Sequence, residues 1–309
     1  MLTLDIWSWD PGEPRTSAEE ACRAMRDHAV ASLESGADVV LFPEFCWMGL
    51  APMLRQSHSG AVDDVARVGQ WFWQKGWPSL VEDPALSRGL VVFGTCPCEI
   101  QNGTGDTEWR NRAPLLLEGT PTHQDKLHLT PWEAHPQEPH AIRLSPGDSL
   151  QLLSFRGLTL AVLVCLDIEI PEISAALRGS GVDLILVPSA TETCLGAERV
   201  NRCASARAIE LGCHVAVAPL TGRADTDLID VNLGWNALYS PSQTAFLERV
   251  REDRDTSLIE SGSRRRRYQI ERERLQEMRR NRLETNPSSV TQVFPPEIEW
   301  MGGFPFRRP

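Results

Sequence analysis

The sequence has 309 residues, 42 of them acidic and 31 basic, for a formal net charge of −11. This acidic balance argues against general nucleic-acid binding and against binding to anionic membrane surfaces. Hydrophobic residues make up 41% of the chain, so its length fits one large α/β domain or two smaller ones with a real core.

The first residues include no basic segment followed by an apolar one, so we expect no signal peptide. No apolar run is long enough for a transmembrane helix, so we expect no membrane association. Eight cysteines without an export signal are typical of reduced thiols. We therefore predict a cytoplasmic protein.

Strands and helices alternate along the first half of the chain. Residues 2–9 predict a strand, and Thr16 and Ser17 begin capping patterns that open a helix ending near Gly36. A buried strand follows at 36–44 and ends in Pro43-Glu44. Further on, one helix and three strands are predicted at 61–76, 90–96, 113–117 and 122–127.

The second half repeats the pattern of the first. A buried strand at 158–164 precedes Cys165, and a short helix follows at 171–177. The stretch 181–189 then matches 36–44, 145 residues later: Gly, a small or branched residue, Asp, four apolar residues, Pro and a polar residue. Each copy follows a helix that follows a strand, so we predict an α/β domain with an internal pseudo-twofold. A further helix and two strands are predicted at 200–211, 213–218 and 234–240.

The C-terminal part is less regular. Arg264–Arg267 could be an anion or nucleic-acid patch, but the net charge favours a solvated strand edge beside acidic residues. Residues 270–282 predict an exposed helix with i,i+4 ion pairs. We assign 1–283 to one domain and 284–309 to a proline-rich tail with aromatic residues, docked on the domain or on a partner subunit.

Cys165 lies where the buried strand gives way to the helix that begins at Pro171. The partial positive charge of a helix N-terminus lowers a thiol pKa and favours the nucleophilic thiolate. A buried structural cysteine is the alternative, because free cysteines are often fully buried.

Two charged residues stand near the ends of other apolar strands, as Cys165 does. Of the 31 basic residues 29 are arginine, and the only lysines are Lys75 and Lys126. Glu44 ends the stretch VVLFPE, and Lys126 lies in HQDKLHL, also at a strand end, where α/β proteins build their sites. Glu, Lys and Cys in one apolar pocket suit acyl transfer: Glu44 accepts the thiol proton, Lys126 stabilises the oxyanion and Cys165 forms the covalent intermediate.

In these motifs the chain resembles the nitrilase superfamily of carbon–nitrogen hydrolases. The family carries a Glu in a PE context, a Lys in a K-x-H-L-like context and a Cys in a C-x-D-x-x-x-P-E context, in the order found here. The run RVNRCASARAIELGCHVAV also resembles the family's segment after the nucleophile. The resemblance covers about residues 1–250.

The resemblance implies a four-layer α-β-β-α sandwich and assembly into homodimers or larger homo-oligomers. It also implies a second carboxylate between the Lys and the Cys, which Glu133 fits best and Glu138 next. The family often has an aromatic residue after the Cys, whereas this chain has Leu166, whose backbone N–H can still serve the oxyanion hole. By the pseudo-twofold, Thr191 lines the pocket mouth or is a solvated loop residue.

Cys165-Leu166-Asp167 is closer to the Cys-Tyr-Asp pattern of amidase-like members than to the Cys-Trp-Glu of nitrilases. We therefore predict hydrolysis of an amide of a small-molecule substrate, with nitrile or ureido hydrolysis or acyl transfer as alternatives. An inactive interaction protein with the same fold is the alternative of another class. The chemistry requires no cofactor and no metal, although His123, His128, His135 and His140 cluster in the sequence.

Overall fold

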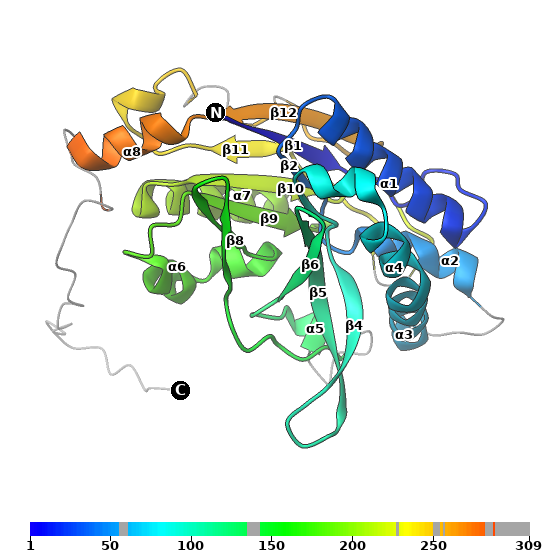
Figure 1. The fold of residues 1–309 in the computed structure, drawn as a ribbon. Coiled ribbons are helices and arrows are strands. Elements are labelled where there is room, and N and C mark those ends of the chain that lie inside the picture. Colours follow the sequence, from blue (N-terminus) through cyan, green and yellow to red (C-terminus); the bar gives the residue numbers. More distant parts are fainter. Residues whose placement is uncertain are drawn as a thin grey trace, which may run out of the picture.

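The structure, a computed structural model, describes residues 1–55, 61–134, 143–226, 229–249, 254–255, 257–281 and 287. It contains two β-sheets stacked face to face with helices on their outer sides (Figure 1). No helix of the described part is long and apolar enough to cross a membrane.

The elements of the first half are β1 (Leu2–Ser8), α1 (Ala18–Glu34), β2 (Val39–Leu41), α2 (Ala51–Leu54), α3 (Ala61–Trp71), α4 (Trp77–Val81), β3 (Leu90–Val92), β4 (Cys96–Gln101), β5 (Thr107–Leu117), β6 (Thr120–Asp125) and α5 (Pro131–Ala134). Those of the second half are β7 (Leu152–Phe155), β8 (Leu158–Val162), α6 (Pro171–Leu177), β9 (Leu184–Ser189), α7 (Cys194–Leu211), β10 (His214–Pro219), β11 (Ala237–Tyr239), β12 (Arg264–Ile270) and α8 (Arg272–Asn281).

The order of the strands shows the predicted pseudo-twofold. The first sheet runs β12-β1-β2-β3-β5-β4, with β6 also paired to β5, and the second runs β11-β10-β9-β8-β7. Each sheet has a central triplet of parallel strands, β1-β2-β3 in one and β8-β9-β10 in the other. An antiparallel strand flanks each triplet on both sides, namely β12 and β5 in the first sheet and β7 and β11 in the second. The matched strands predicted from the sequence, β2 and β9, are the middle strands of their triplets.

The strand β2 is apolar at every position because both of its faces are covered. Val39 and Leu41 belong to the core between the sheets, whereas Val40 and Phe42 belong to the core that contains the apolar side of α1. Successive side chains of a strand point to opposite faces, so a central strand covered on both faces needs apolar residues at every position. The α-β-β-α sandwich predicted for this chain is therefore the fold.

Most element boundaries agree with the predictions, with four corrections. The strand expected at 113–117 is longer and begins at Thr107, as β5. The expected helix at 61–76 is α3 followed by a π-helical turn, Phe72–Gly76, that leads into α4. The strand expected at 90–96 divides into β3 and the start of β4, which pairs with β5 in a long hairpin that projects from the body in Figure 1. The helix expected at 200–211 begins earlier, at Cys194, because the Thr193 side chain accepts a hydrogen bond from Gly196 N and caps it.

The arginine run forms β12, which lies along the edge of the first sheet and pairs antiparallel with β1. Arg267 binds the fully buried Asp5 through two hydrogen bonds, of 2.7 and 2.8 Å, so this arginine ties the C-terminal strand to the first one. The favoured interpretation of a strand edge beside acidic residues fits this arrangement. The predicted docking of the tail 284–309 falls outside the described residues, apart from 287, and the predicted homodimer stays a prediction.

Candidate active site

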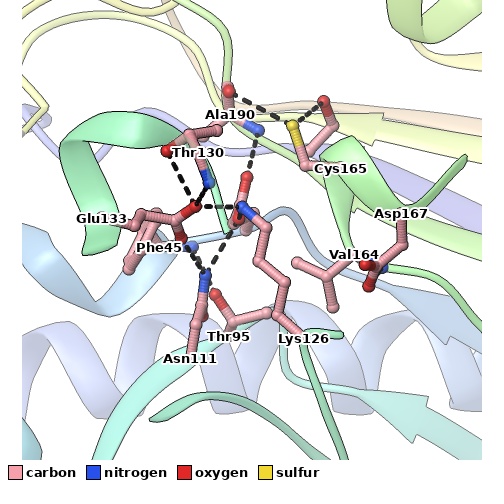
Figure 2. A network of polar contacts seen from close by, with 12 residues as sticks. Phe45, Thr95, Asn111, Lys126, Thr130, Glu133, Val164, Cys165, Asp167 and Ala190 are labelled. Atoms are coloured by element: carbon pink, nitrogen blue, oxygen red, sulfur yellow. Dashed lines mark hydrogen bonds and ion pairs between the residues drawn. The ribbon is translucent and has the colours of Figure 1, made fainter. Parts of the chain in front are cut away.

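The structure brings Glu44, Lys126, Glu133 and Cys165 together. Figure 2 shows the last three of these close to one another. Glu44 follows β2, Lys126 directly follows β6, Glu133 lies in α5 and Cys165 follows β8. All four side chains are buried, with exposed fractions of 1%, 1%, 0% and 6% in that order. The sequence separates them by up to 121 residues, yet the sheet topology places them in one cluster.

Lys126 is held between two carboxylates. Its Nζ donates to Glu44 Oε1 at 2.8 Å and to Glu133 Oε2 at 2.7 Å. Burial alone would lower the pKa of Lys126, but the charges of Glu133 and Glu44 outweigh that effect and raise its pKa, so the ammonium stays charged. A lysine has three N–H donors, and two of them are used by these carboxylates.

Glu44 is a buried carboxyl group that can exchange a proton near neutral pH. Burial raises the pKa of Glu44 to about 7, against the opposing effect of Lys126. Its Oε1 accepts from Lys126, and its Oε2 accepts from the backbone N–H of Ala190 at 3.0 Å. Ala190 follows β9, so the carboxylate that comes from the first sheet is anchored on the second.

Cys165 has a strained backbone, with φ of 47°, at the first residue of a short 3₁₀ turn, Cys165–Glu169. Its Sγ lies 3.5 Å from Ala190 O and 3.6 Å from Ser189 Oγ. The expected activation by a helix N-terminus is not found, because α6 begins only at Pro171 and burial raises the pKa of the Cys165 thiol. The thiol therefore needs a neighbouring base to take its proton.

Asp167 does not cap α6, whose N-cap residue is Ile170. Its buried carboxylate instead accepts hydrogen bonds from three backbone N–H groups: Val164 N at 3.1 Å, Leu127 N at 3.2 Å and His128 N at 2.8 Å. The first belongs to the turn that carries Cys165, and the other two follow Lys126. This one carboxylate thus ties the loop of the lysine to the turn of the cysteine.

Of the two acidic residues proposed as the second carboxylate, Glu133 contacts Lys126, whereas Glu138 lies outside the described residues. The Glu133 Oε2 atom also accepts from Thr130 N at 2.8 Å and from Thr130 Oγ1 at 2.9 Å. Leu166 is half-buried directly after Cys165. Thr191 is also half-buried, and its hydroxyl donates to Leu233 O at 2.8 Å, so it fixes the loop beside Ala190.

Four contributors were missed in the sequence: Asn111, Thr130, Ser189 and Ala190. Ser189 had a usable signal, because it occupies the repeat position that matches Glu44. Ala190 acts through its backbone, and Asn111 lies in the polar stretch WRNR, so neither carried a signal in its side chain type.

Among the described residues no three His, Cys, Asp or Glu side chains gather as metal ligands. His135 and His140 lie outside those residues. His128 points its Nδ1 at Asp167 Oδ1, 3.4 Å away, and its side chain is 44% exposed. The expectation of a site without metal or cofactor stays an expectation.

The two stacked sheets and their helices give this chain the fold of the nitrilase superfamily. A crystallised amidase from Nesterenkonia sp. superposes with a TM-score of 0.63 at 20% identity, covering 91% of this chain and 96% of that one. Saccharomyces cerevisiae Nit3, a nitrilase-superfamily member, gives 0.60 at 17% identity, covering 91% and 93%. At these identities the likeness concerns the fold.

The chain belongs to the carbon–nitrogen hydrolase family, whose model matches residues 83–250. That range contains Lys126, Glu133 and Cys165, while Glu44 precedes it. The probable hydrolase YhcX of Bacillus subtilis (strain 168) is 26% identical over 233 residues, 74% of this chain and 43% of its own length. An (R)-stereoselective amidase of Pseudomonas sp is 28% identical over 161 residues, 52% of this chain and 51% of its own. The chain thus spans about half or less of the length of these curated relatives.

We expect Asp167→Asn to destabilise the fold by about 2–4 kcal/mol, since an amide turns donors toward buried N–H groups and removes a charge they solvate. Urea denaturation of the purified chain measures the loss. Asp148→Asn is the matched control, because Asp148 is 80% exposed in its ion pair with Arg110, and such pairs contribute less than about 1 kcal/mol. Equal losses in the two variants would contradict the role given to Asp167.

Proposed function

We propose that this chain hydrolyses a non-peptide carbon–nitrogen bond, specifically an amide of a small molecule, through a covalent intermediate on Cys165. The observation that carries the proposal is the buried Lys126 ammonium, bound by two carboxylates, beside a base with a pKa of about 7 and a buried thiol. Perturbed titratable groups gathered at strand ends are typical of catalytic sites.

In the first step Glu44 takes the Cys165 proton as the sulfur attacks the carbonyl carbon. A carbon–sulfur bond forms, and the carbonyl electron pair moves to oxygen. The third N–H of Lys126 and the backbone N–H of Leu166 hold this oxyanion. Since Lys126 is already charged and fixed by its carboxylates, it needs no reorganisation when the negative charge develops.

In the second step the tetrahedral intermediate collapses. Glu44 delivers its proton to the amide nitrogen, the carbon–nitrogen bond breaks and ammonia or an amine leaves. The acyl group stays on Cys165. Water then attacks the acyl carbon while Glu44 accepts its proton, and a carbon–oxygen bond forms. The carbon–sulfur bond breaks, the acid leaves and Glu44 returns the proton to the sulfur. Glu133 keeps Lys126 in place through both halves of the reaction.

Two features favour an amide over a nitrile. A nitrile is hydrolysed to the acid only if the thioimidate loses ammonia after water adds, and residues next to the nucleophile are well placed to direct that collapse. Leu166 has no polar side chain for this task, and the Asp167 carboxylate already accepts three backbone hydrogen bonds. An amide also brings the carbonyl oxygen that Lys126 is placed to receive.

An inactive interaction protein would need another reason to bury this cluster. Taking an ammonium and two carboxylates out of water costs free energy that pairing only partly returns. A packed apolar set of the same volume would stabilise the fold as well. The cluster therefore supports the enzyme over the interaction protein.

We expect Lys126→Arg to lower kcat about 100-fold or more, nearly as much as Lys126→Ala, because a planar guanidinium does not fit between the carboxylates and aim one N–H at the oxyanion. The measurement is ammonia release from an amide found to be a substrate. The control is Lys75→Arg, because Lys75 is the other lysine of the chain and is exposed. If Lys126→Arg retained a substantial kcat, the requirement for a compact ammonium at this position would be refuted.

We also expect a higher kcat/KM for a primary amide than for the nitrile with the same carbon skeleton. Both compounds are assayed side by side at neutral pH, and the acid product is quantified. A tenfold preference for the nitrile, about 1.4 kcal/mol in transition-state stabilisation, would overturn the amidase proposal but leave Cys165, Lys126 and Glu44 in their roles.

A further inference from the structure

Asn111 lies in the middle of the charged cluster. It sits on β5, is fully buried, and its backbone carbonyl accepts a hydrogen bond from Lys126 N at 2.9 Å. Its side-chain Nδ2 donates to Glu44 Oε1 at 2.9 Å and to Glu133 Oε1 at 3.2 Å. Figure 2 shows this amide nitrogen beneath the Lys126 ammonium. One residue thus fixes the backbone of the lysine and both of its carboxylates.

The geometry points to Asn111 as a positioning residue that holds Glu44 and Glu133 toward Lys126 and keeps Glu44 ready to accept the Cys165 proton. This inference rests on the proposed function, since it assumes that Glu44 is the base. The hydrogen bonds of the Asn111 side chain go to Glu44 and Glu133, so it acts through these two carboxylates.

The charge balance of the cluster favours an uncharged hydrogen-bond donor at position 111. With both carboxylates ionised, the two negative charges exceed the single positive charge of Lys126. A second cation would bring the net charge to zero but lower the pKa of Glu44 and weaken it as a base, while a third carboxylate would repel the other two. An amide nitrogen with two N–H groups supplies one hydrogen bond to each carboxylate without changing the net charge.

Asn111 also affects the proton affinity of Glu44. A hydrogen bond to the ionised form of a carboxyl favours that form, so removing it should raise the pKa of Glu44 further above its usual range. Glu44 has to be ionised to accept the thiol proton. The reaction rate of Cys165 falls at low pH as Glu44 becomes protonated, and this part of the pH profile is its acid limb. Loss of the Asn111 amide should therefore move the acid limb to higher pH and leave the rate above it nearly unchanged.

The test measures alkylation of Cys165 by iodoacetamide as a function of pH, which needs no knowledge of the substrate. The sulfur displaces iodide from carbon while Glu44 takes the proton, and peptide mass spectrometry separates Cys165 from the exposed Cys194. Relative to wild type, Asn111→Leu should shift the midpoint upward by about one pH unit, with an about tenfold slower reaction below the wild-type midpoint. Asn111→Asp, which keeps the shape but adds a charge, should shift it at least as far and serves if the leucine variant does not fold.

Asn236→Leu is the matched control. Asn236 is 1% exposed, its Nδ2 donates to Arg264 O at 3.3 Å, and its Oδ1, like that of Asn111, has no partner among the described residues. This variant should lose stability but keep the wild-type midpoint.

The outcomes separate the two proposals. If Glu44→Gln alkylates with the wild-type pH profile, Glu44 is not the base and the proposed function fails. If Glu44→Gln removes the acid limb but folded Asn111→Leu or Asn111→Asp keeps the wild-type midpoint, only the role of Asn111 is overturned. A shift of equal size in Asn236→Leu would also overturn it, since the effect would then come from general destabilisation.

Discussion

The burial of Lys126 is the constraint on which the site depends. An ammonium removed from water is tolerated only when charges and hydrogen bonds replace its hydration. Here Glu44 and Glu133 replace it, and each carboxylate in turn needs its own donors. Those donors come from Asn111 on β5, from Thr130 before α5 and from Ala190 after β9. The requirement to solvate one buried charge thus draws segments of both sheets together.

The internal repeat explains how the sheets meet there. Pro43-Glu44 follows the middle strand β2, and the middle strand β9 ends in Pro188-Ser189, at the matching positions of the repeat. Glu44, which comes from the first sheet, accepts a hydrogen bond from Ala190 N, which follows β9 of the second sheet. Ser189 lies beside the Cys165 sulfur. The two halves share a backbone pattern but differ in side chains: the first supplies Glu44, and the second supplies Cys165 and the Ser189 hydroxyl beside its sulfur. Asp167 completes the arrangement by binding the lysine loop and the cysteine turn with one carboxylate.

The apolar strands and the charged residues at their ends could be predicted from the sequence. The run at 36–44 is apolar on both faces because β2 is covered on both sides, which fixes the fold class. Glu44, Lys126 and Cys165 stood out as polar residues after such runs. Asn111 did not, because it lies between two arginines and outside the strand predicted at 113–117. Only the structure shows that β5 begins at Thr107 and brings Asn111 to the carboxylates of Lys126. Two of the three partners of Asp167 were also hidden, since they are backbone groups from a loop about 40 residues away.

The most direct test of the central claim, that this buried cluster makes Cys165 a nucleophile, is mass spectrometry of the protein quenched during turnover of an amide library. The account predicts a gain equal to the mass of one amide less ammonia, located on the Cys165 peptide and absent from Cys165→Ala. Turnover of an amide with no adduct on Cys165, or turnover retained by Cys165→Ala within tenfold of wild type, would contradict it.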